Sequence, residues 1–69
     1  MSGITVVSNG RPVELPEGAT VADLLTALRL GGKWVLVERN GEPVERSRYA
    51  DVALAGGDRL VVARPVAGG

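Results

Sequence analysis

The 69-residue sequence contains no cysteine and no histidine. Without cysteine, the chain can form neither a disulfide nor a thiolate metal site, and it has no thiol nucleophile. Without histidine, it lacks the usual acid–base group at neutral pH and the commonest ligand of transition metals. We therefore expect a protein that is not an enzyme by itself and that binds no metal ion.

Aromatic residues and net charge are also scarce. Trp34 and Tyr49 are the only aromatic residues, and eight basic residues balance eight acidic ones. Nucleic-acid-binding proteins normally carry a basic face, and those that bind single strands add several aromatic side chains for stacking. We therefore expect no nucleic acid among the direct partners.

Long apolar runs are missing as well. No stretch approaches the length needed to cross a membrane, and the N-terminal residues lack the basic and apolar regions of a signal peptide. A soluble cytoplasmic protein is the expectation. Hydrophobic residues still make up 45% of the chain, which is enough for the core of one small domain.

The first two predicted strands, residues 4–8 and 11–15, flank an Asn-Gly turn at residues 9–10, the strongest short signal for a β-hairpin. The turn sets a register that pairs Ser8 with Arg11, Val6 with Val13, and Ile4 with Leu15. Pro12 then lies opposite Val7, where a residue without an N–H is tolerated only at a sheet edge. The pattern predicts a hairpin whose second strand is an edge strand.

A helix is predicted over residues 21–30. Thr20 is the expected N-cap, with Asp23 three residues later in a weak capping box. Apolar residues then recur at helical spacing, at Val21, Leu24, Leu25 and Leu28. Gly31 and Gly32 are expected to close the helix, whose leucine stripe should cover one face of the sheet.

The second half of the chain contains two further predicted strands. Residues 34–39 form an apolar run that favours a central strand, ended by a second Asn-Gly pair at residues 40–41. Residues 42–51 are polar and expected to be irregular, anchored by Pro43, Val44 and Tyr49, with Arg46 as a further anchor. Residues 52–54 fit a short strand or turn, and residues 55–58 a tight turn. Residues 59–64 fit a final strand, which Pro65 should end.

This order of elements, ββαββ, predicts an α+β protein with the ubiquitin-like β-grasp fold. We expect a mixed sheet of four to five strands with one main helix on one face. The helical crossover should place the first strand parallel to a later one, with the final strand in the centre. Residues 1–65 form the predicted domain, and residues 66–69 a flexible tail.

The tail ends in Gly68-Gly69 and carries the most informative group of the chain, a free carboxylate on a narrow stalk. Residues 65–69 span at most about 17 Å when extended, enough to enter an enzyme's cleft. Fixing each residue costs about 1–2 kcal/mol of backbone entropy, so the tail by itself supplies little affinity. Gly69 is the predicted reactive residue, preceded by Val66 and Ala67.

Binding affinity should therefore come from the sheet face away from the helix. The candidate docking residues are Val7, Leu36, Val61 and Ala63, with Arg59, Arg64 and Val66 nearer to the tail. Exposed apolar side chains mark a docking surface only where they form one patch. Trp34 is expected to pack against the end of the helix rather than to contact a partner.

The sequence resembles the thiamine-biosynthesis sulfur carrier family (ThiS) over nearly its whole length. The matching segments are residues 9–10, 20–25, 35–41, 44–49, 57–59 and 66–69. Arg46 followed by an aromatic residue at Tyr49 is typical of these carriers. They more often have proline before that arginine, where this chain has Glu45.

The resemblance implies a carrier that works with other enzymes and binds no permanent cofactor. An E1-like adenylyltransferase would use MgATP to adenylate the carboxylate of Gly69. A persulfide sulfur, supplied by a donor such as a cysteine desulfurase, would then displace AMP and leave a thiocarboxylate. Thiazole synthase would accept this sulfur to build the thiazole of thiamine.

Other functions stay open on the sequence alone. Carriers for tRNA thiolation are about this size, whereas small subunits of molybdopterin synthase are usually longer and have more aromatic residues near the tail. A ubiquitin-like protein modifier would form isopeptide bonds through Gly69. A β-grasp interaction module would carry its terminal glycines by coincidence.

Overall fold

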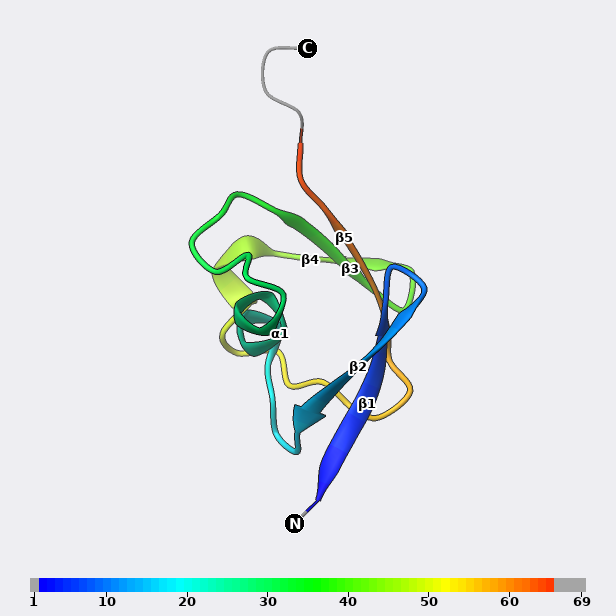
Figure 1. Ribbon diagram of the computed structural model, residues 1–69. Helices are drawn as coiled ribbons and strands as arrows, with labels where there is room; N and C mark the ends of the chain where they lie inside the picture. The colour runs from blue at the N-terminus through cyan, green and yellow to red at the C-terminus, as the bar shows by residue number, and fades with distance from the viewer. Residues whose placement is uncertain (1, 66–69) are drawn as a thin grey trace.

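A five-stranded sheet with one helix against one face is formed by residues 2–65, the part of the chain that the computed structural model describes (Figure 1). The elements are β1 (Gly3–Ser8), β2 (Arg11–Pro16), α1 (Val21–Ala27), β3 (Leu36–Arg39), β4 (Glu42–Val44), the 3-10 helix η1 (Arg46–Arg48) and β5 (Arg59–Ala63). This confirms the predicted α+β class.

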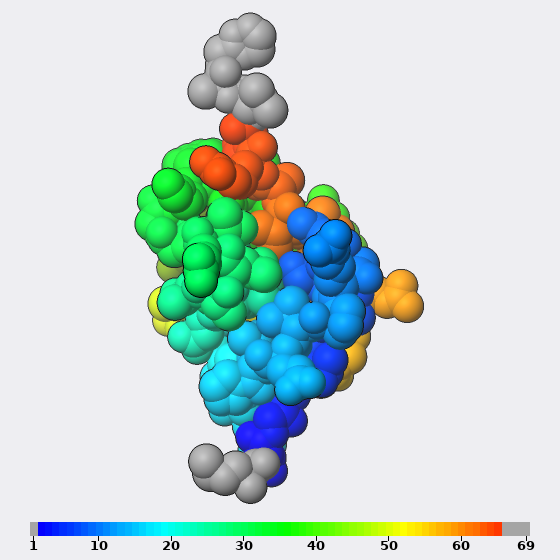
Figure 2. Space-filling view, viewed as in Figure 1, coloured from blue at the N-terminus to red at the C-terminus, as the bar shows by residue number. Residues whose placement is uncertain are grey.

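The strands lie in the order β2-β1-β5-β3-β4. Strand β5 pairs in parallel with β1 and antiparallel with β3, so the predicted parallel pairing and the central position of the last strand are both confirmed. The end of β5 reaches the surface between the segment after α1, in green, and the β1–β2 turn, in blue (Figure 2). The centre of the sheet therefore leads directly to the predicted tail.

The β1–β2 hairpin has the predicted register. Ser8 pairs with Arg11, Val6 with Val13, and Ile4 with Leu15. Asn9 and Gly10 both have positive φ, 51° and 81°, as this class of two-residue turn requires. Pro12 lies opposite Val7, and β2 is an edge strand, so the missing N–H of proline leaves no partner unpaired.

Strand β4 corrects the prediction that residues 42–51 are irregular throughout. Asn40 and Gly41, at φ of 52° and 87°, form a second two-residue turn. It folds Glu42–Val44 back on β3, with Pro43 opposite Glu38. The element order is therefore ββαβββ, and β3 is an interior strand that begins at residue 36, not 34. A three-residue strand with one charged residue and one proline has too little apolar alternation to be recognised in the sequence.

The helix begins as predicted and ends earlier. The N–H of Asp23 donates to Thr20 Oγ1 (3.2 Å) and the N–H of Thr20 donates to Asp23 Oδ2 (2.9 Å), which completes the capping box. The last helical residue is Ala27, so the prediction that Gly31 and Gly32 close the helix is wrong.

Arg29 ends the helix in the left-handed conformation, at φ of 62°. Its N–H donates to the carbonyl of Thr26 (3.0 Å), and that of Leu30 donates to the carbonyl of Leu25 (2.7 Å). These two bonds form a Schellman motif. Leu30 packs partly buried against the core, and this contact accounts for the early stop at a residue other than glycine.

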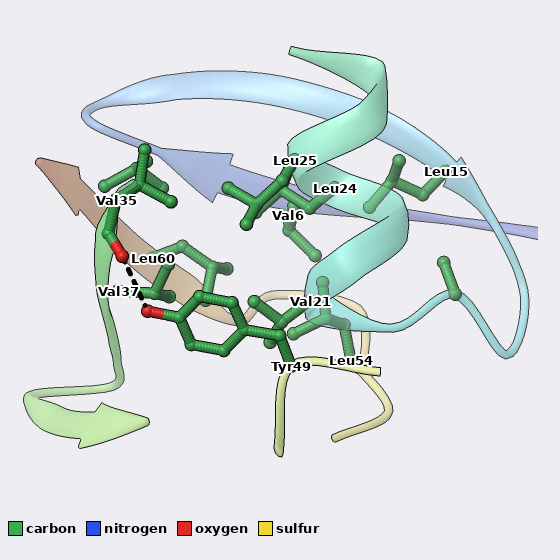
Figure 3. Close-up of a cluster of buried hydrophobic side chains, with 12 residues drawn as sticks. Val6, Leu15, Val21, Leu24, Leu25, Val35, Val37, Tyr49, Leu54 and Leu60 are labelled. Carbon is green, nitrogen blue, oxygen red and sulfur yellow. Dashed lines mark hydrogen bonds between the residues drawn. The ribbon is translucent and has the colours of Figure 1, made fainter. Parts of the chain in front are cut away.

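The core lies between the helix and the inner face of the sheet (Figure 3). Its fully buried side chains are Leu24 and Val21 from α1, Val6 from β1, Leu60 from β5, and Val35 just before β3. Tyr49 closes one side, and its hydroxyl donates to the carbonyl of Val35 (3.0 Å). Tyr49 is thus the predicted anchor of the segment after β4.

Trp34 is more exposed than its predicted packing against the end of the helix implies. Its side chain is 59% exposed, and the guanidinium of Arg46 lies 3.6 Å from the centre of its ring. The exposed position follows from the backbone, because Val35 and Val37 take the inward positions and leave Trp34 and Leu36 outside. Arg46 therefore contacts Trp34 rather than anchoring its own segment in the core.

Candidate functional site

Strand β5 carries the chain from the core to the predicted tail. Ala63 is the last residue that pairs in the sheet, opposite Leu36, and Arg64 and Pro65 continue beyond it. The predicted end of pairing at Pro65 is therefore confirmed. The predicted reactive residue Gly69, with Val66, Ala67 and Gly68, lies outside the described residues.

The side chain of Asn9 holds the last part of β5. Strand β1 ends at Ser8, opposite Leu60, so it does not reach Val62 through its own backbone. The amide of Asn9 replaces the missing pairing. Its Nδ2 donates to the carbonyl of Val62 (2.9 Å), and the N–H of Val62 donates to its Oδ1 (2.8 Å). Both sides of β5 are thus held almost to its end.

Asn40 has the same role at the beginning of β5. The N–H of Arg59 donates to Asn40 Oδ1 (2.9 Å), and Asn40 Nδ2 donates to Asp58 Oδ1 (3.1 Å). The two Asn-Gly turns, one on each side of β5, therefore both bond to it with their asparagine amides. In the sequence, these asparagines are recognisable only as turn residues. No local pattern reveals a bond between residues 53 positions apart, such as that from Asn9 to Val62.

Asp58 is a buried carboxylate at the turn before β5. It also accepts from the N–H of Ala55 (2.8 Å) and from Arg39 Nε (2.9 Å). Burial by itself raises the pKa of this carboxyl. The bonds from Ala55, Asn40 and Arg39, together with the charge of Arg39, outweigh burial and hold the pKa below its ordinary value of 3.8. The start of β5 is therefore fixed by an ionised carboxylate.

Five of the predicted docking residues lie together on the outer face of the sheet. Val7 is next to Arg59 across the β1–β5 pair, and Ala63 is next to Leu36 across the β3–β5 pair. Val61 lies between them on β5, and both Val61 and Leu36 are 52% exposed. We call the residues Val7, Leu36, Arg59, Val61 and Ala63 the outer face. Glu38, which was not among the predicted docking residues, pairs with Val61 in the middle of the outer face.

Arg64, the sixth predicted docking residue, is placed elsewhere. It lines a groove together with residues of the β1–β2 turn and of the segment after α1: Ser8, Asn9, Arg11, Pro12, Val13, Leu28, Leu30 and Val62. Val62 points inward, and Arg64 follows it by two residues, so the alternation of β5 directs Arg64 away from the outer face. The groove therefore lies beside Arg64, one residue before the end of the described chain.

Residues 2–65 contain no cluster of acidic side chains that could hold a metal ion. None of the helices formed by these residues is long and apolar enough to cross a membrane. The described residues thus form a central strand bonded on both sides, an outer face with exposed apolar side chains, and a groove lined by Arg64 near their C-terminal end.

Comparison with known proteins gives the family. The sequence model of the ThiS family matches residues 5–69. The chain is 37% identical over 62 residues to the sulfur carrier protein ThiS of Bacillus subtilis, covering 88% of this chain and 94% of that protein. It is 39% identical over 64 residues to a thiazole synthase of Paramagnetospirillum magneticum. That match covers 93% of this chain, which spans only 20% of the length of that relative.

Solved structures agree with the sequence relatives. The crystal structure of ThiS from Geobacter metallireducens superposes with a TM-score of 0.78 at 30% identity, covering 96% of this chain and 100% of that one. SAMP1 from Haloferax volcanii gives a TM-score of 0.62 at 26% identity, covering 99% and 100%. The fold is therefore the predicted ubiquitin-like β-grasp, and the chain belongs to the ThiS family of sulfur carriers.

Proposed function

We propose that this chain carries sulfur for the synthesis of the thiamine thiazole, with the carboxylate of Gly69 as the group that is loaded. The observation that carries the proposal is the family match, which extends over residues 5–69 and so includes both terminal glycines. The chain itself acts as the carrier, and its partners supply the catalysis. We infer that it works in the cytoplasm, where MgATP is available.

Loading proceeds in three steps. A carboxylate oxygen of Gly69 attacks the α-phosphate of ATP, pyrophosphate leaves, and an acyl-adenylate forms on an E1-like adenylyltransferase. The terminal sulfur of an enzyme persulfide, supplied by a cysteine desulfurase, then attacks the carbonyl carbon, and AMP leaves with the electron pair. A second thiol then attacks the enzyme sulfur of the resulting acyl disulfide. A new disulfide forms between the two thiols, and the thiocarboxylate of the carrier leaves.

The folded domain contributes the position of this carboxylate and the binding energy. Asn9 and Leu36 hold the two sides of β5 as far as Val62 and Ala63, so the chain leaves the sheet from a fixed point. The exposed side chains of Leu36 and Val61 on the outer face provide apolar area for an enzyme surface. Burying such area is worth about 25 cal/mol per Å², which offsets the entropy lost by ordering the tail.

Thiazole synthase is the proposed acceptor of the sulfur. The support is the relative from Paramagnetospirillum magneticum, which is named a thiazole synthase and contains a segment similar to 93% of this chain. A protein that combines both parts brings carrier and acceptor together. We infer that this chain delivers its sulfur to a thiazole synthase of the same kind.

The test is loading followed by intact mass spectrometry. The carrier is incubated with MgATP, its cognate activating enzyme and a sulfide source. The expected product is heavier by the difference between sulfur and oxygen, and a variant that lacks Gly69 should not change in mass. Conjugates linked to lysine side chains in a cell lysate would instead assign the chain to the protein modifiers. A tail that no activating enzyme adenylates would overturn the proposal.

A further inference from the structure

Positive charge is concentrated in three segments that are far apart in the sequence. Residues 9–13, 28–36 and 62–65 contain four of the eight basic residues and none of the eight acidic ones. These basic residues are Arg11, Arg29, Lys33 and Arg64, and we call them the basic collar. The rest of the chain therefore carries an excess of negative charge, although the net charge of the whole is zero.

The fold brings these segments together around the exit of the chain. Arg11 and Arg64 line one groove together with Leu28 and Leu30. In Figure 2 the end of β5 emerges between the segment after α1, in green, and the β1–β2 turn, in blue. Arg11 and Arg64 thus lie at the groove beside the end of the described chain, and Arg29 and Lys33 belong to the segment after α1 that borders it.

The four side chains of the basic collar are exposed and form no ion pair among residues 2–65. Arg11, Arg29, Lys33 and Arg64 are all exposed to solvent. The ion pairs among residues 2–65 are Arg39 with Asp58 and Arg48 with Asp51, so no collar side chain is paired with a carboxylate of the described part. An unpaired group of like charges raises the local potential, and this potential attracts an oppositely charged surface.

We propose that the basic collar binds an acidic rim around the active-site cleft of the enzyme that activates the tail. This inference rests on the proposed function. Four residues beyond Pro65 span at most about 14 Å, so the collar must come close to the mouth of any cleft that the tail enters. Exposed charges attract each other at physiological salt only within about one Debye length, roughly 8 Å, so the proposal requires the collar to contact the rim directly. Pro12, Leu28 and Leu30, which line the same groove, add apolar contact area.

Charge at the rim of an interface acts mainly on the rate of association. We therefore expect the association rate constant of carrier and activating enzyme, measured by stopped flow, to fall steeply as NaCl is raised. Arg11→Glu and Lys33→Glu should each lower it about three- to tenfold at low salt. At high salt the variants should approach the wild type, because screening removes the difference.

Arg48→Glu is the matched control, since it makes the same change in net charge at an exposed position outside the collar. It should behave like the wild type. Equal rate constants for Arg11→Glu, Lys33→Glu and Arg48→Glu would overturn the proposal. Faster association of Arg11→Glu would also overturn it, since the collar would then hold the protein's own tail.

Loading is measured separately, by intact mass. A wild type that binds with the expected salt dependence but takes up no sulfur contradicts the proposed function and supports the collar. A wild type that takes up sulfur with an association rate independent of salt does the reverse. The two results therefore distinguish failure of the collar from failure of the carrier function.

Discussion

Asn9 and Asn40 each begin an Asn-Gly turn, and each bonds to the central strand with its side-chain amide. In both turns the positive φ of the asparagine is compatible with glycine. The side-chain contribution can therefore be removed without straining the turn. Because the amides bond to opposite ends of β5, the two positions form a natural pair of variants.

We predict that Asn9→Gly lowers the free energy of unfolding by about 1–3 kcal/mol, since two hydrogen bonds to the buried Val62 are lost. Urea denaturation measures the loss. Hydrogen exchange should accelerate at the amide of Val62 in this variant, and at the amide of Arg59 in Asn40→Gly. Unchanged exchange at Val62 would show that Asn9 does not hold the end of β5.

Asp58 makes the free energy of unfolding depend on pH in the acid range. Its pKa is lower in the folded protein than the ordinary value of 3.8, so the unfolded chain takes up a proton first as the pH falls. The stabilisation is fully present above that value and is lost as the pH falls through the folded pKa. We predict that Asp58→Asn costs about 1–3 kcal/mol at pH 7 and flattens the acid limb of the stability curve. A wild-type acid limb retained in the variant would contradict this role.

At the scale of elements, the end of α1 is the clearest site for stabilisation. Arg29 takes a left-handed conformation, which costs a non-glycine residue about 1 kcal/mol. We predict that Arg29→Gly raises the free energy of unfolding by about 0.5–1 kcal/mol, as measured in urea. Leu28→Gly, which changes the neighbouring residue at a negative φ of −87°, should destabilise instead. A loss of stability in Arg29→Gly would mean that the arginine side chain itself contributes.

The elements also show how far the sequence could lead. The hairpin register of β1 and β2 follows from Asn-Gly and strict alternation, and the structure has each predicted pair. The predicted end of α1 was wrong because the true end depends on the packing of Leu30 against the core. This is a tertiary contact, which helical periodicity in the sequence does not reveal. Strand β4 was missed because its pairing depends on β3 being present beside it.

The candidate site was also predictable only where local alternation determines it. Val61 and Ala63 were expected on the face away from the helix, and the alternation of β5 places both there. The same alternation also explains why Arg64 lines the groove instead of the outer face. The groove itself joins three segments distant in sequence, so only the fold could reveal it. The prediction of Gly69 rests on the Gly-Gly ending and the family resemblance, and this residue lies outside the described residues.

At the scale of the whole molecule, the two faces of the sheet have different roles. The inner face packs on α1 and determines stability, whereas the outer face is exposed and is proposed to bind partners. Neighbouring residues on β5 test this division directly, because Val61 is 52% exposed and Val62 is 8% exposed. The same substitution can be made at both, since Val→Thr keeps the branched shape and adds one hydroxyl.

We predict that Val62→Thr lowers the free energy of unfolding by about 1–3 kcal/mol, because it places a hydroxyl in the core. Val61→Thr should change it by less than about 0.5 kcal/mol, as at most surface positions.

Loading should instead be impaired by substitutions on the outer face. The pair Leu36→Thr and Val61→Thr should raise the KM of the activating enzyme for the carrier about tenfold, the factor that corresponds to losing roughly 1.5 kcal/mol of apolar burial. Steady-state adenylation assays measure this KM, and an unchanged value in the double variant would remove the outer face from the docking surface.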